Sequence, residues 1–118
     1  GVLDNVVEEL ESLGKEQAYK LGSSYRVLLM HLLKWRYQPS RRSRSRAGTV
    51  VRERLNAAEI LAENPGLRPR VRALFGRAYS GARREAAAET GLPLSTFPET
   101  CPFSIAKAFD EDWWPEPE

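Results

Sequence analysis

The chain has 118 residues, of which 42% are hydrophobic and 29% charged, and its formal net charge is +2. This length and composition are typical of one globular domain with a single core, so we treat residues 1–118 as one domain. No apolar run reaches the roughly 18–20 residues of a membrane span, the start lacks a basic-then-apolar signal segment, and the single cysteine, Cys101, excludes an internal disulfide. We therefore expect a cytoplasmic protein without membrane contact.

Leu, Ala, Glu and Arg dominate the sequence, and Val, Ile and Thr never alternate over several residues, which predicts an all-α fold. A first helix is expected over residues 4–13, with Asp4 as its N-cap, and Gly14 should end or kink it. A second helix is expected over residues 15–38, because Pro39 stops it. Its later half is apolar nearly all round and should be the central buried helix. The apolar stripe of the first helix consists of Leu3, Val6, Val7, Leu10 and Leu13.

A connector of alternating Ser and Arg is expected over residues 40–46, and a third helix over residues 47–63. A fourth helix is expected over residues 68–90, with Gly91 as its C-cap. Ser95 and Ser104 are each suited to cap a short helix further on. The predicted architecture is a helical bundle of about four main helices, with a long central second helix and short C-terminal helical turns. The predicted buried stripes are Val51, Leu55, Ala58 and Ala62 on the third helix, and Val71, Leu74, Phe75, Ala78, Ala82 and Ala86 on the fourth.

Basic residues gather around Pro39, and no acidic residue occurs between Glu16 and Glu53. Arginine forks pair with phosphate, so this cluster suits an anion such as a nucleic-acid backbone, and Trp35 and Tyr37 are placed to stack on bases. Internal pairing with acidic residues and an acidic protein partner are the alternatives, and no nucleic-acid fold signature is present. The candidates for an external anion are Arg36, Arg41, Arg44, Arg46 and Arg52.

A second set of polar residues faces inward in helical projections. His31 lies with Lys34 and Gln38 on a narrow polar strip of the second helix. Glu89 falls in line with the inner stripe of the fourth helix, where a carboxylate needs a partner. Glu9 would reach His31 if the first two helices packed antiparallel. The expected partners of the carboxylates are Arg42, Arg54 and His31. The full set, a structural network or a candidate site, consists of Glu9, His31, Lys34, Gln38, Arg42, Glu85 and Glu89.

No motif identifies a reaction, because metalloprotease, Walker and nucleophile-elbow patterns are all absent. We predict no metal, no cofactor and no catalytic residue, and we interpret Cys101 as a small hydrophobe. Trp113 and Trp114 are either anchors on the fold's own surface or an exposed patch for a partner. The leading hypothesis is a non-enzymatic binding or regulatory module that contacts a protein, a nucleic acid or another anion. The alternatives are the structural subunit of a homodimer and a small nuclease-like enzyme built from Glu9, His31, Lys34, Arg42 and Glu89.

Several segments resemble the bacterial domain-of-unknown-function family numbered twenty-nine: LDNVVEELESLGK, YRVLLMHLLKWRYQP, RRSRS, and AAAETGLPLSTFPETCPFS with DEDWWPE. The resemblance covers nearly the whole chain and implies an all-helical fold in a bacterial cytoplasm, but no activity. Family members usually carry an aromatic-rich helical stretch before the position of Leu3, so we expect a truncated chain with uncovered apolar surface. The chain has Ala47 where the family's connector commonly has an aromatic. The motifs carry Glu9, His31, Lys34, Tyr37, Gln38, Arg41, Arg42, Ser45 and Glu89.

Overall fold

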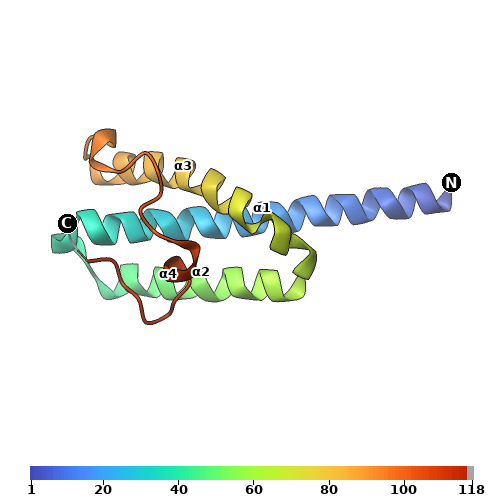
Figure 1. The fold of residues 1–118 in the computed structure, drawn as a ribbon, viewed down its shortest axis with the longest axis horizontal. Helices are drawn as coiled ribbons and strands as arrows, with labels where there is room; N and C mark the ends of the chain where they lie inside the picture. Colours follow the sequence, from blue (N-terminus) through green and yellow to red (C-terminus); the bar gives the residue numbers. More distant parts are fainter. Residues whose placement is uncertain (117–118) are drawn as a thin grey trace.

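One long helix dominates the computed structural model, which describes residues 1–116 (Figure 1). Helix α1 spans Val2–Tyr37, α2 spans Arg44–Glu63, α3 spans Val71–Thr90 and the short α4 spans Ile105–Ala108. Short stretches of 3₁₀ helix occupy Pro39–Arg41 (η1), Pro65–Arg70 (η2) and Leu94–Thr96 (η3). The described part of the chain contains no strand. The predicted all-α class, with a long central helix and short C-terminal helical turns, is confirmed.

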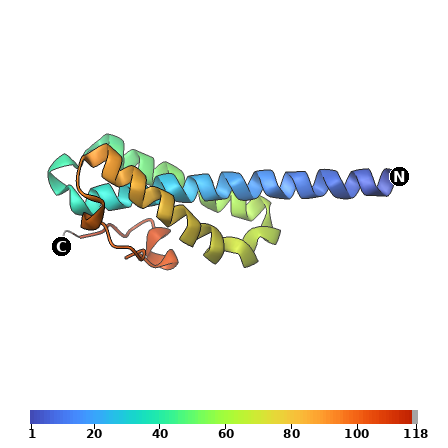
Figure 2. The ribbon, with the colours of Figure 1, turned by 90° about the horizontal axis from the view of Figure 1, so that it is seen from above.

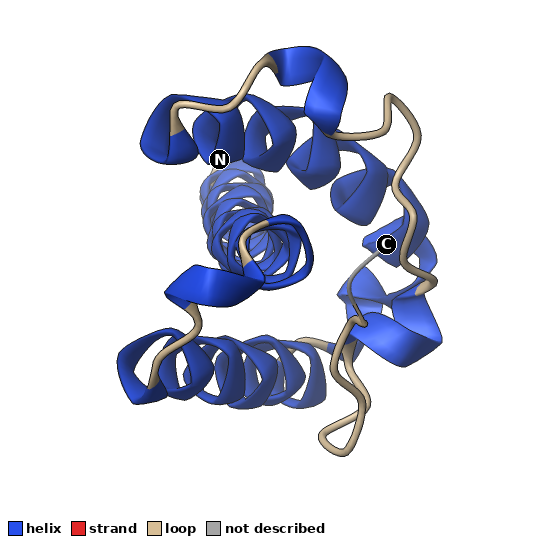
Figure 3. Cartoon of the chain, turned by 90° about the vertical axis from the view of Figure 1, so that its left-hand side faces the viewer, coloured by secondary structure: helices blue, strands red, loops and turns tan. Residues whose placement is uncertain are grey.

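The second half of α1 is the centre of the bundle. It lies between α2 and α3, which pack against it from different sides (Figures 1 and 3). Leu21, Leu28, Leu29, Leu32 and Leu33 have no exposed surface, as the apolar pattern predicts. Each such leucine contributes about 2 kcal/mol of transfer free energy. This row fixes α1 between its neighbours and therefore fixes which polar side chains of α1 face α2 and α3.

The predicted helix break at Gly14 is wrong, because α1 runs unbroken through Gly14 and has 36 residues in all. A glycine inside a helix costs about 1 kcal/mol relative to alanine, and the strong helix formers around it, including Leu13 and Lys15, are sufficient to offset that cost. The helix starts at Val2 with Gly1 as its N-cap, so Asp4 lies in the first turn instead of capping it. The first two predicted helices are therefore one element.

Helix α2 begins earlier than predicted and turns a different face inward. Ser43 is its N-cap and accepts a hydrogen bond of 3.1 Å from the backbone N–H of Arg46, so most of the expected connector is helical. The buried positions are Val50, Arg54, Ala57 and Ile60. The stripe predicted to be buried lies on the solvent side, and Val51 and Leu55 are 46% and 65% exposed. Two stripes with helical spacing compete in this sequence, and the one carrying an arginine is the one that packs.

The third long helix and the segment after it follow the prediction more closely. Leu74, Phe75 and Ala78 of α3 are buried, and Gly91 ends the helix with a left-handed backbone (φ 74°). Ser104 caps α4 by accepting a 3.1 Å hydrogen bond from the N–H of Lys107. Ser95, by contrast, lies inside η3 and caps nothing. The C-terminal segment, residues 91–116, then crosses the bundle (Figure 1), and residues 117–118 lie outside the described residues.

The first part of α1 projects beyond the bundle as an arm, which we define as residues 2–16 (Figures 1 and 2). All of its residues are exposed, and Ala18 is the first buried residue of the chain. At 1.5 Å per residue the arm is about 22 Å long. Its predicted apolar stripe faces solvent, with Leu3, Leu10 and Leu13 at 80%, 62% and 54% exposure. This uncovered stripe agrees with the apolar surface expected from the sequence.

Candidate functional site

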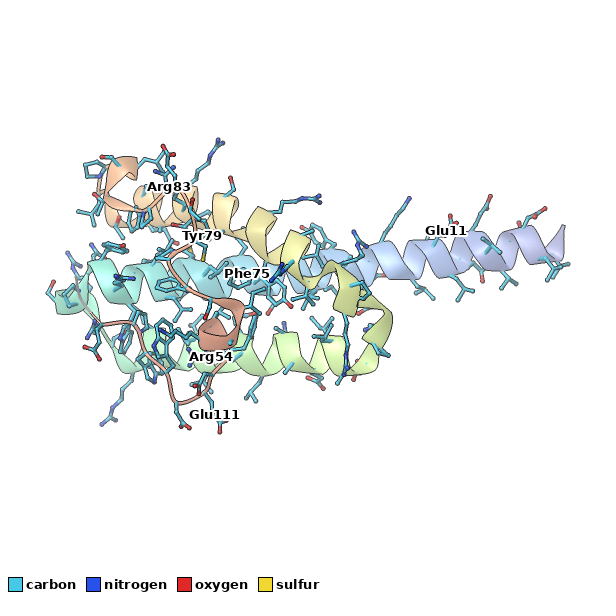
Figure 4. All side chains as sticks on the ribbon, in the orientation of Figure 1. Glu11, Arg54, Phe75, Tyr79, Arg83 and Glu111 are labelled. Atoms are coloured by element: carbon cyan, nitrogen blue, oxygen red, sulfur yellow. The ribbon has the colours of Figure 1, made fainter. Side chains whose placement is uncertain are left out.

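Arg54 of α2 is almost fully buried, at 5% exposure, and points toward the C-terminal segment (Figure 4). Its Nε donates to the carbonyl of Ala108 and its Nη2 to the carbonyl of Trp113, both at 2.8 Å. Its guanidinium lies 5.4 Å from the ring centroid of Trp114. Burial lowers the pKa of Arg54, and the nearby Asp110 acts in the opposite direction. The predicted inward orientation of Arg54 is confirmed, and its role is to hold the C-terminal segment on α2.

Arg42 also faces inward, but its partners are carbonyl groups and not the predicted carboxylates. Its Nε donates to the carbonyl of Trp35 at 2.9 Å and its Nη2 to that of Pro115 at 3.3 Å. The guanidinium lies 5.1 Å from the ring centroid of Trp35. Because Pro115 lies beside the end of α1, its carbonyl and that of Trp35 take the place of the glutamates expected to pair with Arg42. Arg42 therefore belongs to the structural contacts of the C-terminal segment.

The aromatic residues predicted to stack on bases are engaged within the fold. Trp35 contacts Trp114 with ring centroids 4.6 Å apart, and Tyr37 contacts Phe97 at 5.3 Å. Of the two alternatives open for Trp114, this contact favours an anchor on the fold's own surface over an exposed patch for a partner. Trp113 is likewise anchored, with its ring centroid 5.6 Å from that of Phe103.

Arg36 was expected to face solvent, and this expectation is wrong. Its guanidinium lies 5.6 Å from the ring centroid of Tyr37 and 6.0 Å from that of Phe103. The C-terminal segment brings Phe103 over this part of α1, a long-range contact that helical projection of the sequence cannot include. Arg36 is therefore removed from the set of residues that face an external anion.

The two carboxylates of α3 pair with α1. Glu85 Oε1 lies 3.1 Å from Nε of Arg26, and Glu89 Oε1 lies 3.5 Å from Nζ of Lys34. The predicted ties between α3 and the region around α1 therefore exist, but the predicted partners Arg42 and Arg54 do not form them. Sequence reasoning missed Arg26, although its helical spacing from Lys34 places both on the side of α1 that meets α3.

His31 lies in a small polar cluster near the C-terminal end of α1, where α1 meets α3. Its Nδ1 donates a 2.9 Å hydrogen bond to the carbonyl of Val27, which leaves Nε2 as an acceptor. Burial lowers the pKa of His31; the Val27 carbonyl and Glu89 raise it, whereas Lys34 and Arg46 lower it. Arg46 also reaches Gln38, with 3.5 Å between Nη1 and Oε1. The structure thus brings together His31, Lys34, Gln38, Arg46 and Glu89.

Glu9 does not join this cluster. It lies on the exposed arm of the same helix as His31, about 33 Å away along the helix axis at 1.5 Å per residue. The antiparallel packing that would have joined Glu9 to His31 cannot form because Gly14 does not break the helix. The predicted enzymatic constellation of Glu9, His31, Lys34, Arg42 and Glu89 is therefore not assembled as a whole, because Glu9 lies apart on the arm. Within residues 1–116, no group of three or more His, Cys, Asp or Glu side chains is arranged to hold a metal ion.

Cys101 is half-buried, and its thiol donates to the carbonyl of Phe103 at 3.4 Å. Burial raises the pKa of Cys101, with the Phe103 hydrogen bond acting in the opposite direction. A thiol that is less readily ionised than usual is a poor nucleophile. This environment agrees with the interpretation of Cys101 as a small hydrophobic residue.

The remaining arginines of the basic cluster form an outward face at the start of α2. Arg41, Arg44 and Arg52 are exposed, and Arg46 is half-buried. Arg52 donates to the hydroxyl of Thr49 at 3.2 Å. Among residues 1–116, none of these four guanidinium groups forms an ion pair. We call Arg41, Arg44, Arg46 and Arg52 the basic face.

An exposed apolar row continues from the basic face along α2. It repeats with alternating spacings of three and four residues, which is the heptad pattern of helices that pack on another helix. The surface beside it has a shallow depression of about 460 Å³, lined in part by Gly48, Arg52 and Glu59. Helical spacing in the sequence predicts four of the five members of the row as one stripe but places that stripe in the core. We call this row the α2 stripe; it consists of Gly48, Val51, Leu55, Ala58 and Ala62.

Searches of curated proteins and of solved structures returned no match to this chain. A comparison with family models matched one described as Domain of unknown function DUF29, over residues 3–114. The match includes the arm, the polar cluster, the basic face and the α2 stripe. Because the model covers nearly the whole sequence, the chain belongs to the DUF29 family.

Proposed function

We propose that this chain is a non-enzymatic binding module whose recognition surface is the outer face of α2. The ligand is an acidic amphipathic helix of a protein partner, bound through the α2 stripe and the basic face. The observation that carries this proposal is the outward orientation of a heptad row that contains Val51 and Leu55, with Arg44 and Arg52 beside it. The proposed setting is the cytoplasm of a bacterium.

The combination of apolar and basic side chains favours a protein partner over a nucleic acid. Binding of a phosphate backbone requires only cationic side chains. The α2 stripe, by contrast, contributes favourable free energy only when another apolar surface covers it. A nucleic-acid site without base contacts from aromatic residues is also weaker, and Trp35 and Tyr37 are already packed against Trp114 and Phe97. Among the described residues, no helix is long and apolar enough to cross a membrane.

The alternative of a small enzyme has less support. Its proposed residues separate in the structure, because Glu9 lies on the arm and Arg42 contacts carbonyl groups of the C-terminal segment. In the polar cluster that does form, Lys34 pairs with Glu89, and His31 is oriented by its own helix. These contacts are typical of a structural network at the junction of α1 and α3.

The test is a titration of the full chain with a labelled, designed helical peptide that has Leu at heptad positions and Glu beside them. We expect binding that weakens as salt is raised, because the Debye length shortens. Leu55→Glu, or Arg44→Glu combined with Arg52→Glu, should reduce the affinity at least tenfold. The matched controls, Leu94→Glu for the apolar change and Arg70→Glu with Arg72→Glu for the charges, alter exposed residues elsewhere and should leave the affinity unchanged.

The same titration is repeated with a labelled DNA duplex. Duplex binding that depends on Arg44 and Arg52 but not on Leu55 would show a phosphate site in place of a helix site. Equal peptide affinity for the native chain and the Leu55→Glu variant would also contradict the proposal.

A further inference from the structure

We infer that the helix bound by the outer face of α2 is the arm of a second copy of this chain, so that two copies exchange their arms. This inference rests on the proposed function and names its partner. The arm and the α2 stripe are the two extended apolar surfaces that the described structure leaves uncovered on its long helices. Three independent properties of these surfaces match: their spacing, their charge and their place in the molecule.

The spacing and size of the side chains are complementary. Leu3, Val6, Leu10 and Leu13 of the arm repeat with intervals of three and four residues, as do the members of the α2 stripe. The arm presents large side chains, whereas the stripe is built largely from glycine and alanine. Large side chains over small ones allow two helices to approach closely. The arm, at about 22 Å, also matches the stripe, which extends about 21 Å from Gly48 to Ala62.

The charges are complementary in one orientation. The arm carries Asp4, Glu8, Glu9 and Glu11 and has no basic side chain before Lys15. The basic face lies at the start of α2, and Glu59 and Glu63 lie exposed near its end. If the arm runs parallel to α2, its acidic first turns meet the basic face and its Lys15 approaches the glutamates. The antiparallel orientation would place acidic groups near one another at the end of α2.

The parallel orientation is also the one that a two-fold axis requires. Within one copy, α2 runs antiparallel to α1: Asn64 at its end contacts Gln17, with 3.3 Å from Nδ2 to Oε1, and Arg46 at its start contacts Gln38. A two-fold axis perpendicular to α1 and close to Gln17 makes the two α1 helices antiparallel. Each arm then lies alongside the partner copy's bundle and runs parallel to the α2 helix there. Both contacts are equivalent, so the dimer is closed.

Sedimentation velocity over micromolar concentrations tests this inference with four versions of the full chain. The native chain and the control Leu94→Glu should be dimers. Leu10→Glu, on the arm, and Leu55→Glu, on the stripe, should each raise the dissociation constant of the dimer at least tenfold. Both positions are exposed, 62% and 65%, so neither change should disturb the fold, which circular dichroism checks.

The decisive sample is an equimolar mixture of Leu10→Glu and Leu55→Glu. A mixed dimer has one native arm on one native stripe, whereas each variant alone has none, so mixing should restore association. A mixture that stays monomeric would overturn the inference, and so would a dimeric Leu55→Glu variant, which would indicate arm-to-arm pairing. A monomeric native chain would overturn it as well. The proposed function is judged separately with the Leu10→Glu variant, whose α2 stripe is native and not covered by a partner's arm, because the designed peptide either binds that stripe or does not.

Discussion

The arginine side chains of this protein differ in what their guanidinium groups contact. Arg54 and Arg42 donate to backbone carbonyls of the C-terminal segment, whereas Arg41 and Arg44 extend into solvent. The need of inward carboxylates for a cationic partner predicts the inward orientation of Arg54 and Arg42. The sequence cannot predict their partners, because every residue offers a carbonyl and only the folded backbone shows which carbonyls return to α2. From the sequence, glutamates are the expected partners of Arg42 and Arg54, but in the structure both arginines pair with backbone carbonyls.

Arg54→Met should destabilise the fold by roughly 2–4 kcal/mol, because it leaves the carbonyls of Ala108 and Trp113 without their charged donor. The matched control is Arg44→Met on the exposed side of the same helix, which should change stability by less than about 0.5 kcal/mol. Urea unfolding followed by circular dichroism measures both. Equal effects for the two variants would show that Arg54 does not hold the C-terminal segment.

His31 should make the stability of the fold depend on pH. Its pKa is lowered in the folded state, mainly by burial, so below about pH 6.5 the unfolded chain binds the proton more readily. The stability contributed by neutral His31 is present above that pH and is lost as the pH falls through the folded-state pKa. The free energy of unfolding should decline between pH 7 and pH 5.5 in the native chain. It should decline less in His31→Asn, and identical slopes would contradict this account.

At the scale of the helices, the continuity of α1 is the property on which the arm depends. Glycine usually marks a helix end, and Gly91 does so with its left-handed backbone. Gly14 has no proline near it and lies among strong helix formers, so the helix continues through this glycine. Residue type alone therefore does not decide where this chain's helices end.

Gly14→Ala should raise the helix content of the arm and stabilise it by roughly 0.5–1 kcal/mol, since the added methyl group meets no atom within 4 Å. Far-ultraviolet circular dichroism and thermal unfolding measure the change. The matched control is Gly91→Ala, which places a side chain at φ 74° and should destabilise the fold. A loss of helix in Gly14→Ala would mean that α1 bends or ends at this position.

Helix α2 shows a second limit of prediction at this scale. Its existence follows from the sequence, but the buried face does not, because Val51 and Leu55 fit a core as well as Val50 and Ile60 do. The C-terminal segment favours the second stripe, because it supplies carbonyl partners to Arg54, which lies on that stripe. The stripe left outside is the feature on which the proposed function depends.

For the whole molecule, the sequence is sufficient to predict an all-helical bundle with a central apolar helix, because that helix is apolar over most of its circumference. The arrangement of the arm relative to the bundle is not predictable in this way, since it depends on whether α1 breaks. The candidate site is predictable in part. His31, Lys34 and Glu89 do converge. Glu9 lies on the arm, toward the opposite end of a molecule whose longest dimension is 58 Å.

The molecule carries two complementary surfaces that are far apart in one copy and, in the proposed dimer, meet between copies. An acidic, apolar arm and an apolar α2 stripe beside the basic face belong to the same chain, although its net charge is only +2. Both apolar surfaces are therefore exposed in the isolated copy. Extended exposed apolar patches are unusual on monomeric proteins and mark interaction sites. Association of two copies buries the arm and the α2 stripe together.

Hydrogen–deuterium exchange of the arm, measured by mass spectrometry at equal concentrations of the native chain and the Leu55→Glu variant, tests this account most directly. Leu55 is 65% exposed on the outer face of α2, whereas the arm of the same copy projects beyond the bundle (Figure 1), so a change at residue 55 reports contact between copies. The account predicts slow exchange at residues 2–13 in the native chain and in the Leu94→Glu control, and fast exchange in Leu55→Glu. Equal exchange of the arm in the native chain and in Leu55→Glu would contradict it.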